Sequence, residues 1–571
     1  MQGYKKSYPS SHSHDLLPLK SANCVYCLCR SISTIMDAVD TAGTPAPSAP
    51  VPSPEQELQV QDGRLEEESI EYPTGFKFVV VLLAMCVSLI LTGLDFNMIA
   101  TALPTITTHF GAVKDVGWYY SAYRLTSCSF QFMFGKLYHL FSVKYVFLAS
   151  VFIFEIGSLI AGAAPNSASL VLGRAVSGMG CAGIISGIFT IVVQSFPLRL
   201  RPFFTGVAAG IEGVSATVAP LLGGALTDSI SWRWCFYLNL PVGCVSFMLV
   251  LIFFQDPQKN ARVNLPWREK LRQLDLLGTS IFIPSITSLL LALQWGGSKY
   301  GWGNSRIIVL FLVTAVLLCA FIWQERRKGD NALLPARIMR SRSLIAGMWF
   351  SFCNNSALSV FEYYIPTYFQ VIRGTSATAS GVMSLPIAIS VPLAVLCGSS
   401  ATSLLGYYTP FMIVTGILTP IAAGLLTTLQ VKQSLASLIC YQALLGVGAG
   451  VGFQGPQVAA QTVLPVKDSP MGIALIIFAQ NFGPALFVSI AQTIFTGQLL
   501  ARLGPLLSNL DPSSLSMADL ERYVPFADLP MVIEAYDEAL TTAFWLPVGL
   551  ACASLFGALG MEWRSVKWKG A

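Results

Sequence analysis

The sequence predicts an all-α polytopic membrane protein, in which two bundles of six helices flank a hairpin of two further helices. Three observations support this fold class. Of the 571 residues, 54% are hydrophobic and 11% are charged, whereas about a quarter of the residues in soluble domains are charged. Apolar windows of about 20 residues, the length that crosses a bilayer, recur along the chain. Lys and Arg concentrate in alternate loops between these windows, which is the pattern that the positive-inside rule describes.

The chain begins with a segment that we expect to stay outside the membrane. Residues 1–72 are rich in Ser, Pro, Ala and Glu and cannot bury a core, so they should form a disordered cytoplasmic tail. No signal peptide is predicted, because the first long apolar run begins near Phe76. Three cysteines cluster in the tail at Cys24, Cys27 and Cys29. Reversible acylation of these thiols is favoured over a metal site, because no predicted fold would hold the metal ligands.

Fourteen windows are predicted to cross the membrane. They lie at 76–102, 116–137, 145–164, 168–194, 203–227, 234–254, 275–295, 306–324, 344–369, 376–398, 408–428, 434–463, 470–497 and 541–561. They group into a first bundle at 73–255, a central segment at 256–343 with cytoplasmic loops and the two extra helices, and a second bundle at 344–561. The acidic stretch 498–540 is predicted to be an extracellular loop, and 562–571 a second cytoplasmic tail. The loop charges and the even number of windows both place the termini in the cytoplasm.

Ionisable side chains within the apolar cores of the windows are functional hypotheses, because a charge in hydrocarbon is costly. They are Asp95, Arg124, Glu155, Arg174, Glu212 and Glu362. The helical rise places Asp95, Arg124 and Arg174 at similar depth, where a carboxylate and two guanidinium groups can share a network. Glu155 and Glu212 fall near the midplane without an evident cation, and burial favours the neutral form of a carboxyl group.

We therefore predict Asp95, Glu155 and Glu212 as candidate proton carriers, with Arg174 and Arg124 as their charge partners. The alternative is that these carboxyl groups only form hydrogen bonds to neighbouring helices. Glu362 lies close to the outer end of its window, a position that is more typical of an interfacial residue than of a proton relay.

The fifth window is rich in glycine, although glycine lowers helix propensity. Small residues one turn apart let two helix backbones approach closely, and a proline bends a membrane helix. We expect Gly213, Pro220, Gly223 and Gly224 to form a conformational pivot. A static helix that only packs closely is the alternative.

The second half of the chain carries few charges but many amides and aromatic rings. A surface of amides and aromatic rings suits an uncharged, amphiphilic ligand, because binding pockets combine apolar area with a few orienting polar groups. We predict a substrate cavity lined by Asn354, Asn355, Phe361, Tyr364, Gln454, Gln457, Gln480 and Asn481. The alternative for each amide is that it holds neighbouring helices together.

No enzyme signature competes with this interpretation. The sequence has four histidines, and none pairs with a nucleophile at a recognisable spacing. The phosphate-binding pattern GxxxxGKS/T is absent from the sequence, which argues against an ATP-driven pump without a separate subunit. We expect no enzymatic activity, no cofactor, no metal site and no nucleic-acid partner.

Four motifs carry a family resemblance. They are LDFNMIATALP at Leu94–Pro104, GRAVSGMGCAG at Gly173–Gly183, VAPLLGG at Val218–Gly224 and SWRWCFYLNLPVG at Ser231–Gly243. Together they resemble motifs of the major facilitator superfamily, and specifically of the fourteen-span drug:proton antiporters. The resemblance covers residues 76–561, and it implies the major facilitator fold and a role in proton transfer for Arg174.

The loop after the second window departs from the family pattern. GKLYHLFSVK keeps Gly135 and Lys144 but has His139 and Ser142 where the family has an acidic residue and a glycine, which puts the usual charge latch between helices in doubt. This variant resembles a fungal subgroup of toxin and secondary-metabolite exporters, similar to gliotoxin, HC-toxin and aflatoxin efflux carriers.

The sequence thus predicts a monomeric, proton-coupled antiporter that exports a hydrophobic small molecule across the plasma membrane by alternating access. The resemblance implies a fungal toxin or another secondary metabolite as the substrate. Its partners are the substrate, protons and the lipid bilayer. A vacuolar or vesicle membrane, and uptake of a nutrient or siderophore, are the transporter alternatives. A transport-dead membrane receptor that signals through the N-terminal tail is the alternative from another class.

Overall fold

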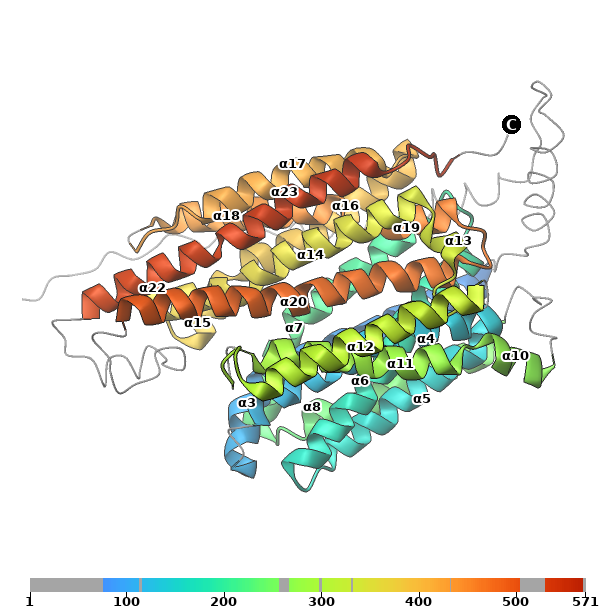
Figure 1. The fold of residues 1–571 in the computed structure, drawn as a ribbon, viewed down its shortest axis with the longest axis horizontal. Helices are drawn as coiled ribbons and strands as arrows, with labels where there is room; N and C mark the ends of the chain where they lie inside the picture. The colour runs from blue at the N-terminus through green and yellow to red at the C-terminus, as the bar shows by residue number, and fades with distance from the viewer. Residues whose placement is uncertain are drawn as a thin grey trace, which may run out of the picture. The chain divides into compact units, whose positions relative to one another are not determined.

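A computed structural model describes residues 75–111, 115–255, 266–296, 300–329, 332–431, 433–503 and 529–567. The predicted tail at 1–72, with its three cysteines, lies outside these residues. Apart from two isolated β-bridges, the regular secondary structure of the described residues is helical (Figure 1). The predicted all-α polytopic fold is thus confirmed.

The first group of helices runs from α3 to α9 and has α6, Ser167–Ser195, at its centre. Of the apolar window of α6, 83% is buried, and the helix packs against both α4 and α5. Glycine makes these contacts close, because a Cβ atom at Gly178 or Gly180 would overlap the backbone of a neighbouring helix. The other members are α3 Gly75–Phe110, α4 Val116–Leu140, α5 Val143–Gly162, α7 Arg201–Ser229, α8 Trp234–Tyr237 and α9 Asn239–Phe253.

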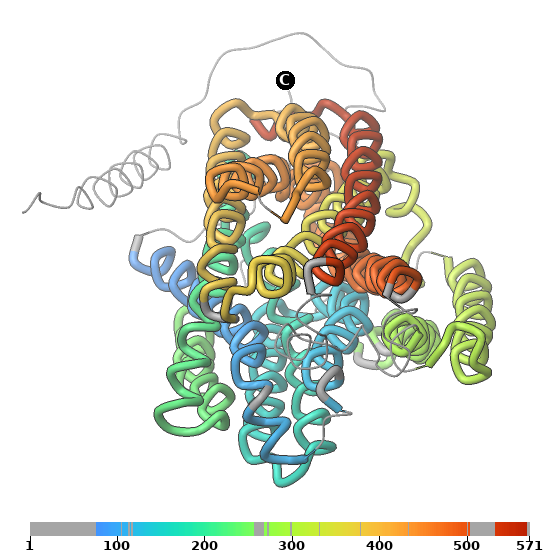
Figure 2. Tube along the Cα trace, turned by 90° about the vertical axis from the view of Figure 1, so that its left-hand side faces the viewer, coloured from blue at the N-terminus to red at the C-terminus, as the bar shows by residue number. Residues whose placement is uncertain are grey.

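The central hairpin consists of α11, Leu276–Trp295, and α12, Ser305–Lys328. α11 packs against α12 and also contacts α4 and α20. α12 lies at the edge of the helix assembly (Figure 2) and buries 22% of its apolar window. This low burial suits a lipid-facing helix. The short helices α10, Trp267–Gln273, and α13, Ala336–Met339, precede and follow the hairpin.

The second group runs from α14 to α23. α14, Arg342–Thr367, packs against α20, Ser469–Leu503, and against α23, Trp545–Gly560. A π-helical turn, Tyr368–Ile372, continues α14. The other members are α15 Ala377–Met383, α16 Leu385–Leu405, α17 Thr409–Leu426, α18 Leu435–Val451, α19 Gly455–Val463 and α22 Leu529–Ala543.

Thirteen helices within the described residues are long and apolar enough to cross a membrane. The predicted window that lacks such a helix is 116–137, which forms α4. The 25 residues of α4 suffice to cross a bilayer, but its serines and tyrosines, together with Arg124, lower its hydropathy. α4 packs against α6, α11 and α20, which shield its polar side chains, and its role as the fourteenth span stays a prediction.

The last two spans extend beyond their predicted limits. α20 continues to Leu503 and α22 begins at Leu529, although 498–540 was expected to be a loop. Residues 504–528, the middle of that loop, lie outside the described residues. The acidic residues of α22 occupy an amphipathic helix, in which polar and apolar side chains separate onto two faces.

The two groups meet along two pairs of helices, α7 with α16 and α4 with α20. Gly206, Gly210 and Gly213 lie about one turn apart on α7 and face α16, because a Cβ atom at each would overlap a side chain of α16. On the other pair, the ring centroids of Phe132 and Phe478 lie 4.5 Å apart. Small residues on one pair and aromatic rings on the other therefore bring the groups into contact.

Candidate functional site

Asp95 of α3 and Arg174 of α6 form an ion pair in the interior of the first group. Arg174 Nη1 lies 2.6 Å from Asp95 Oδ2, and both side chains are fully buried. Arg174 Nε also donates to the backbone carbonyl of Tyr119 at 3.2 Å, and the guanidinium group lies 4.3 Å from the ring centroid of Tyr123. The neighbouring backbone and ring therefore fix the direction of the guanidinium group toward the carboxylate.

Asn239, the first residue of α9, completes this pair, a role that the sequence did not predict. Its Nδ2 atom donates to Asp95 Oδ1 at 2.7 Å and to Ser158 Oγ at 3.2 Å. Both oxygens of Asp95 thus accept a hydrogen bond from another helix. The signal that could have found Asn239 is its place in the motif SWRWCFYLNLPVG.

Glu155 of α5 lies against Gly243 of α9. A Cβ atom at Gly243 would overlap the Glu155 carboxylate, so only glycine leaves the space that this side chain occupies. Both carboxylate oxygens are buried, and neither has a hydrogen-bond partner among the described residues. Asp95 lies close enough for its charge to act on Glu155. The structure thus places a second carboxyl group beside the Asp95–Arg174 pair.

Arg124 does not join that pair but reaches across to the second group of helices. Its Nη1 atom donates to Asn481 Oδ1 of α20 at 2.6 Å, and its guanidinium group lies 4.0 Å from the ring centroid of Phe96. Its charge acts on Glu212 of α7 and on Glu362 of α14. Arg124 and Glu362 are exposed and Glu212 is half-buried. The sequence position of Glu362 favours an interfacial residue, but in the structure Glu362 lies near the other charges.

The predicted substrate-cavity residues fall into two sets. Asn354, Phe361 and Tyr364 are buried to within 2% and connect helices of the second group in this conformation. Asn354, for example, donates to the backbone carbonyl of Ala449 on α18, and the Tyr364 hydroxyl donates to Gln492. Contact of these three residues with a substrate stays a prediction.

The remaining cavity residues lie on α14, at the start of α19 and on α20. Gln457 donates to Gln480 at 3.0 Å, and Asn355 donates to the backbone carbonyl of Gln480 at 2.8 Å. Gln454 points to the first group, where its amide lies 3.5 Å from the backbone carbonyl of Thr205. Among the predicted cavity residues, Asn481 forms a hydrogen bond with a charged side chain of the first group of helices, Arg124.

The predicted pivot residues on α7 have different surroundings. Gly213 faces Pro392 of α16, and Gly223 faces the backbone of α3 at Met98. Pro220 lies inside the helix between them. A Cβ atom at Gly224 would meet nothing within 4 Å. Close packing therefore explains the glycine at 213 and 223 but not at 224, and the pivot itself stays a prediction.

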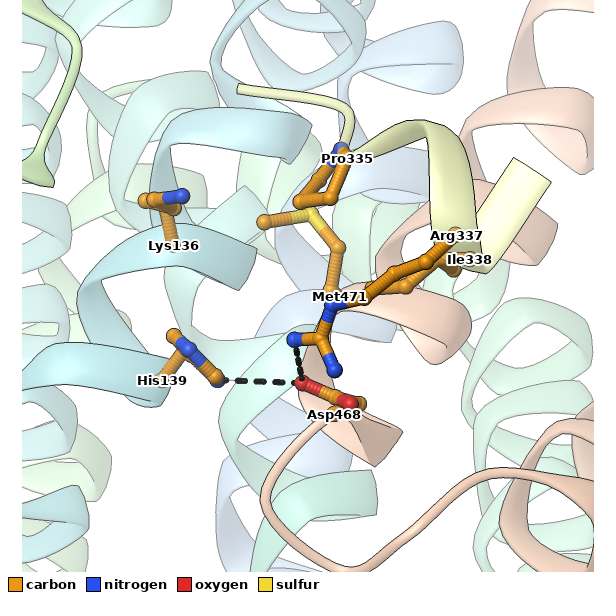
Figure 3. A pocket seen from close by; sticks show the side chains of 7 residues that line it. All are labelled: Lys136, His139, Pro335, Arg337, Ile338, Asp468 and Met471. Carbon is orange, nitrogen blue, oxygen red and sulfur yellow. Dashed lines mark hydrogen bonds and ion pairs between the residues drawn. The ribbon is translucent and has the colours of Figure 1, made fainter. Parts of the chain in front are cut away.

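The loop that departs from the family pattern holds a cluster of charges, shown in Figure 3, which we call the Asp468 cluster. Arg337 Nη2 lies 2.7 Å from Asp468 Oδ1, and His139 Nδ1 lies 3.9 Å from the same oxygen. His139 Nδ1 also contacts the backbone carbonyl of Lys467. Nearby, Lys136 donates to the carbonyl of Ala332 at 2.7 Å. These contacts connect α4, the segment 332–341 and the start of α20.

The Asp468 cluster has its acid at a different place from the family pattern, which has an acidic residue at position 139. The acid comes from Asp468, which precedes the first turn of α20, where a negative charge interacts favourably with the helix dipole. His139, at the position expected to be acidic, faces this carboxylate. The structure thus has a charged contact at this position, with the acid in the segment before α20, and whether it acts as the usual latch stays open to test.

The described residues contain no group of three or more His, Cys, Asp or Glu side chains that could hold a metal ion. The polar site is instead a set of protonatable carboxyl groups and fixed guanidinium groups. Such a set can bind and release protons, and it can make and break ion pairs between helices.

Comparisons with known proteins agree with the motifs. The family profile described as Major Facilitator Superfamily matches residues 85–488. The chain is 46% identical over 505 residues to the MFS-type efflux pump MFS1 of Trichophyton rubrum, which covers 88% of this chain and 94% of that protein. It is 42% identical over 507 residues to the efflux pump roqT of Penicillium rubens, with 88% and 94% covered.

Solved structures share the fold. The human organic anion transporter MFSD10 matches with a TM-score of 0.54 at 13% identity, over 84% of this chain and 100% of that chain. The proton:xylose symporter XylE matches with a TM-score of 0.54 at 13% identity, over 86% and 98%. At such identities the similarity concerns the fold alone. The family profile and the fungal relatives carry the assignment, and the chain belongs to the major facilitator superfamily.

Proposed function

We propose that this protein is a proton-coupled antiporter that exports a hydrophobic small molecule, such as a fungal toxin or another secondary metabolite, by alternating access. The names of its fungal relatives as efflux pumps support export. The positive-inside pattern supports cytoplasmic termini, and the family resemblance supports a monomer in the plasma membrane.

The observation that carries this proposal is the arrangement of Arg124, Glu212 and Glu362. Solvent-accessible charges on membrane helices cannot face hydrocarbon without a large cost, so they indicate a water-accessible path between the two groups. No ion pair within 4.0 Å joins these three side chains in the part of the chain that the structure describes. Arg124 donates a hydrogen bond to Asn481 of the second group of helices. Protonation of Glu212 or Glu362 therefore changes the electrostatic field at a contact between the two groups of helices.

Aromatic rings beside these charges supply apolar contact area. Tyr120 of α4 is 43% exposed and Tyr363 of α14 is 55% exposed, and the two hydroxyl groups are close enough to interact electrostatically. Together with the Asn481 amide they combine apolar area with orienting polar groups, as binding sites for small molecules do. An amphiphilic substrate between the groups would contact both halves of the chain.

Inside-out vesicles from cells that produce the protein test this proposal. With an imposed pH gradient, acid inside, hydrophobic fungal metabolites should accumulate in the vesicles, and collapse of the gradient should abolish accumulation. Glu212→Gln should lose the response to the gradient. Glu534→Gln serves as the matched control, because Glu534 is exposed on α22, and it should behave as the wild type. Accumulation that does not respond to the gradient would exclude coupling to protons.

A further inference from the structure

Helix α9 contacts two carboxyl groups of this site, Asp95 and Glu155, and provides a hydrogen-bond donor to only the first of them. Asp95 has both oxygens bonded, to Arg174 Nη1 and to Asn239 Nδ2. Glu155 has neither oxygen bonded among the described residues. Because an ionised carboxylate is an acceptor only, donors on both oxygens stabilise its charged form, and the lack of donors around a buried carboxyl group favours its neutral form.

The spacing of residues on two helices produces this difference. Asn239 and Gly243 are four residues apart on α9, and Glu155 and Ser158 are three residues apart on α5, so each pair lies on one face of its helix. The two helices pack against each other. Asn239 therefore meets Ser158 while Gly243 meets Glu155. At one end of this contact Asn239 supplies an amide donor. At the other end Gly243, which has no side chain, leaves space for the Glu155 carboxylate.

The surroundings of Glu155 contain few other titratable groups. Asp95 is the charged residue that acts on it, and Arg174 is paired with Asp95. As titratable side chains of the packed elements, α8 contributes Cys235 and Tyr237, α9 contributes Cys244, and α6 contributes Cys181 besides Arg174. No lysine or arginine occurs in α8 or α9.

We propose that α9 gives these two carboxyl groups different roles. Asn239 is a positioning residue that keeps Asp95 ionised beside Arg174, and Gly243 leaves the space in which Glu155 binds a proton. This inference rests on the proposed function and deepens it, because it names a group, besides Glu212, that changes protonation. Asp95 then serves as the fixed counter-ion of Arg174, and Glu155 takes up and releases a proton.

Infrared difference spectroscopy of the purified protein in liposomes, between acidic and alkaline pH, tests this division. The wild type should show carbonyl bands of protonated carboxyl groups, and one component of these bands should be lost in Glu155→Gln and kept in Asp95→Asn. Asn239→Ala should add a further carboxyl component, because Asp95 loses one donor, and should shift the pH profile of transport. The control is Gln131→Ala, since Gln131 is 1% exposed and bonds to Ser186 in the same group of helices. It should change neither readout.

Gly243→Ala provides a second test, because the added methyl group overlaps the Glu155 carboxylate and should shift or weaken its band. Gly549→Ala is its control, as a Cβ atom at Gly549 would meet nothing within 4 Å. A Glu155→Gln protein with the same carboxyl bands as the wild type, or an Asn239→Ala protein that matches Gln131→Ala, would overturn the inference while proton-coupled transport by the wild type still supports the proposed function. Wild-type transport without proton coupling would overturn both.

Discussion

Single residues show which parts of the site the sequence can predict. Depth along the helices identified Asp95 and Arg174 as partners, because a buried charge requires a nearby opposite charge. The same argument did not find Asn239, since an amide carries no charge that demands a partner. It also did not place Glu362 near Arg124, because the lateral position of a helix is set by packing and not by depth.

The Asp95–Arg174 pair makes a prediction about stability. Asp95→Asn leaves Arg174 buried without its anion, and loss of one partner of a buried pair costs about 3–5 kcal/mol, so the thermal unfolding temperature of the purified protein should fall. The double variant Asp95→Asn, Arg174→Met removes both charges and should unfold at a higher temperature than Asp95→Asn alone. A double variant no more stable than Asp95→Asn would contradict this account of the pair.

Among the helices, α7 shows how a sequence motif becomes a contact surface. The glycines of the fifth window predicted close packing, and Gly206, Gly210 and Gly213 do face α16. The sequence could not show which helix they face, because small residues fit any neighbour. α4 shows another limit: the sequence predicts a span at 116–137, but the polar residues of α4 keep it outside the thirteen helices that are long and apolar enough to cross a membrane.

A larger side chain on this face of α7 should separate α7 from α16. Gly206→Val overlaps Ser399, and overpacking of this kind costs about 1–3 kcal/mol, so the closed contact should become less populated. Spin labels at Tyr145 and Leu404, which are each 70% exposed, should report a longer distance in electron-resonance measurements. Gly224→Ala, on the same helix, should leave the distance unchanged. An unchanged distance in Gly206→Val would refute this role of the glycine.

At the scale of the whole molecule, the contacts between the two groups concentrate toward one end. Described contacts of α7 with α16 run from Gly206 to Thr217. Further along α7, Val218 is 39% and Leu221 74% exposed. The end with these contacts also holds the Asp468 cluster, and it is the end that the loop charges predict to be cytoplasmic. Which end is closed depends on the sum of many contacts, so no single motif could predict it.

The Asp468 cluster should stabilise this closed end. Asp468→Asn removes the anion that faces Arg337 and His139, so the labels at Tyr145 and Leu404 should shift toward longer distances. Glu562→Gln is the matched control, because among the described residues the Glu562 carboxylate forms an ion pair with its neighbour Arg564 near the same end and with no other side chain, and it should keep the wild-type distances. If both variants gave the same distribution, the cluster would have no role in closure.

In the proposed mechanism, protons and substrate move in opposite directions through one site. Proteoliposomes in which proton flux and substrate flux are recorded together test it most directly, with the membrane potential held at zero. We expect substrate movement to drive protons the other way, and Glu212→Gln to abolish this proton flux. Protons that move in the same direction as the substrate, or substrate movement without proton flux, would contradict the account.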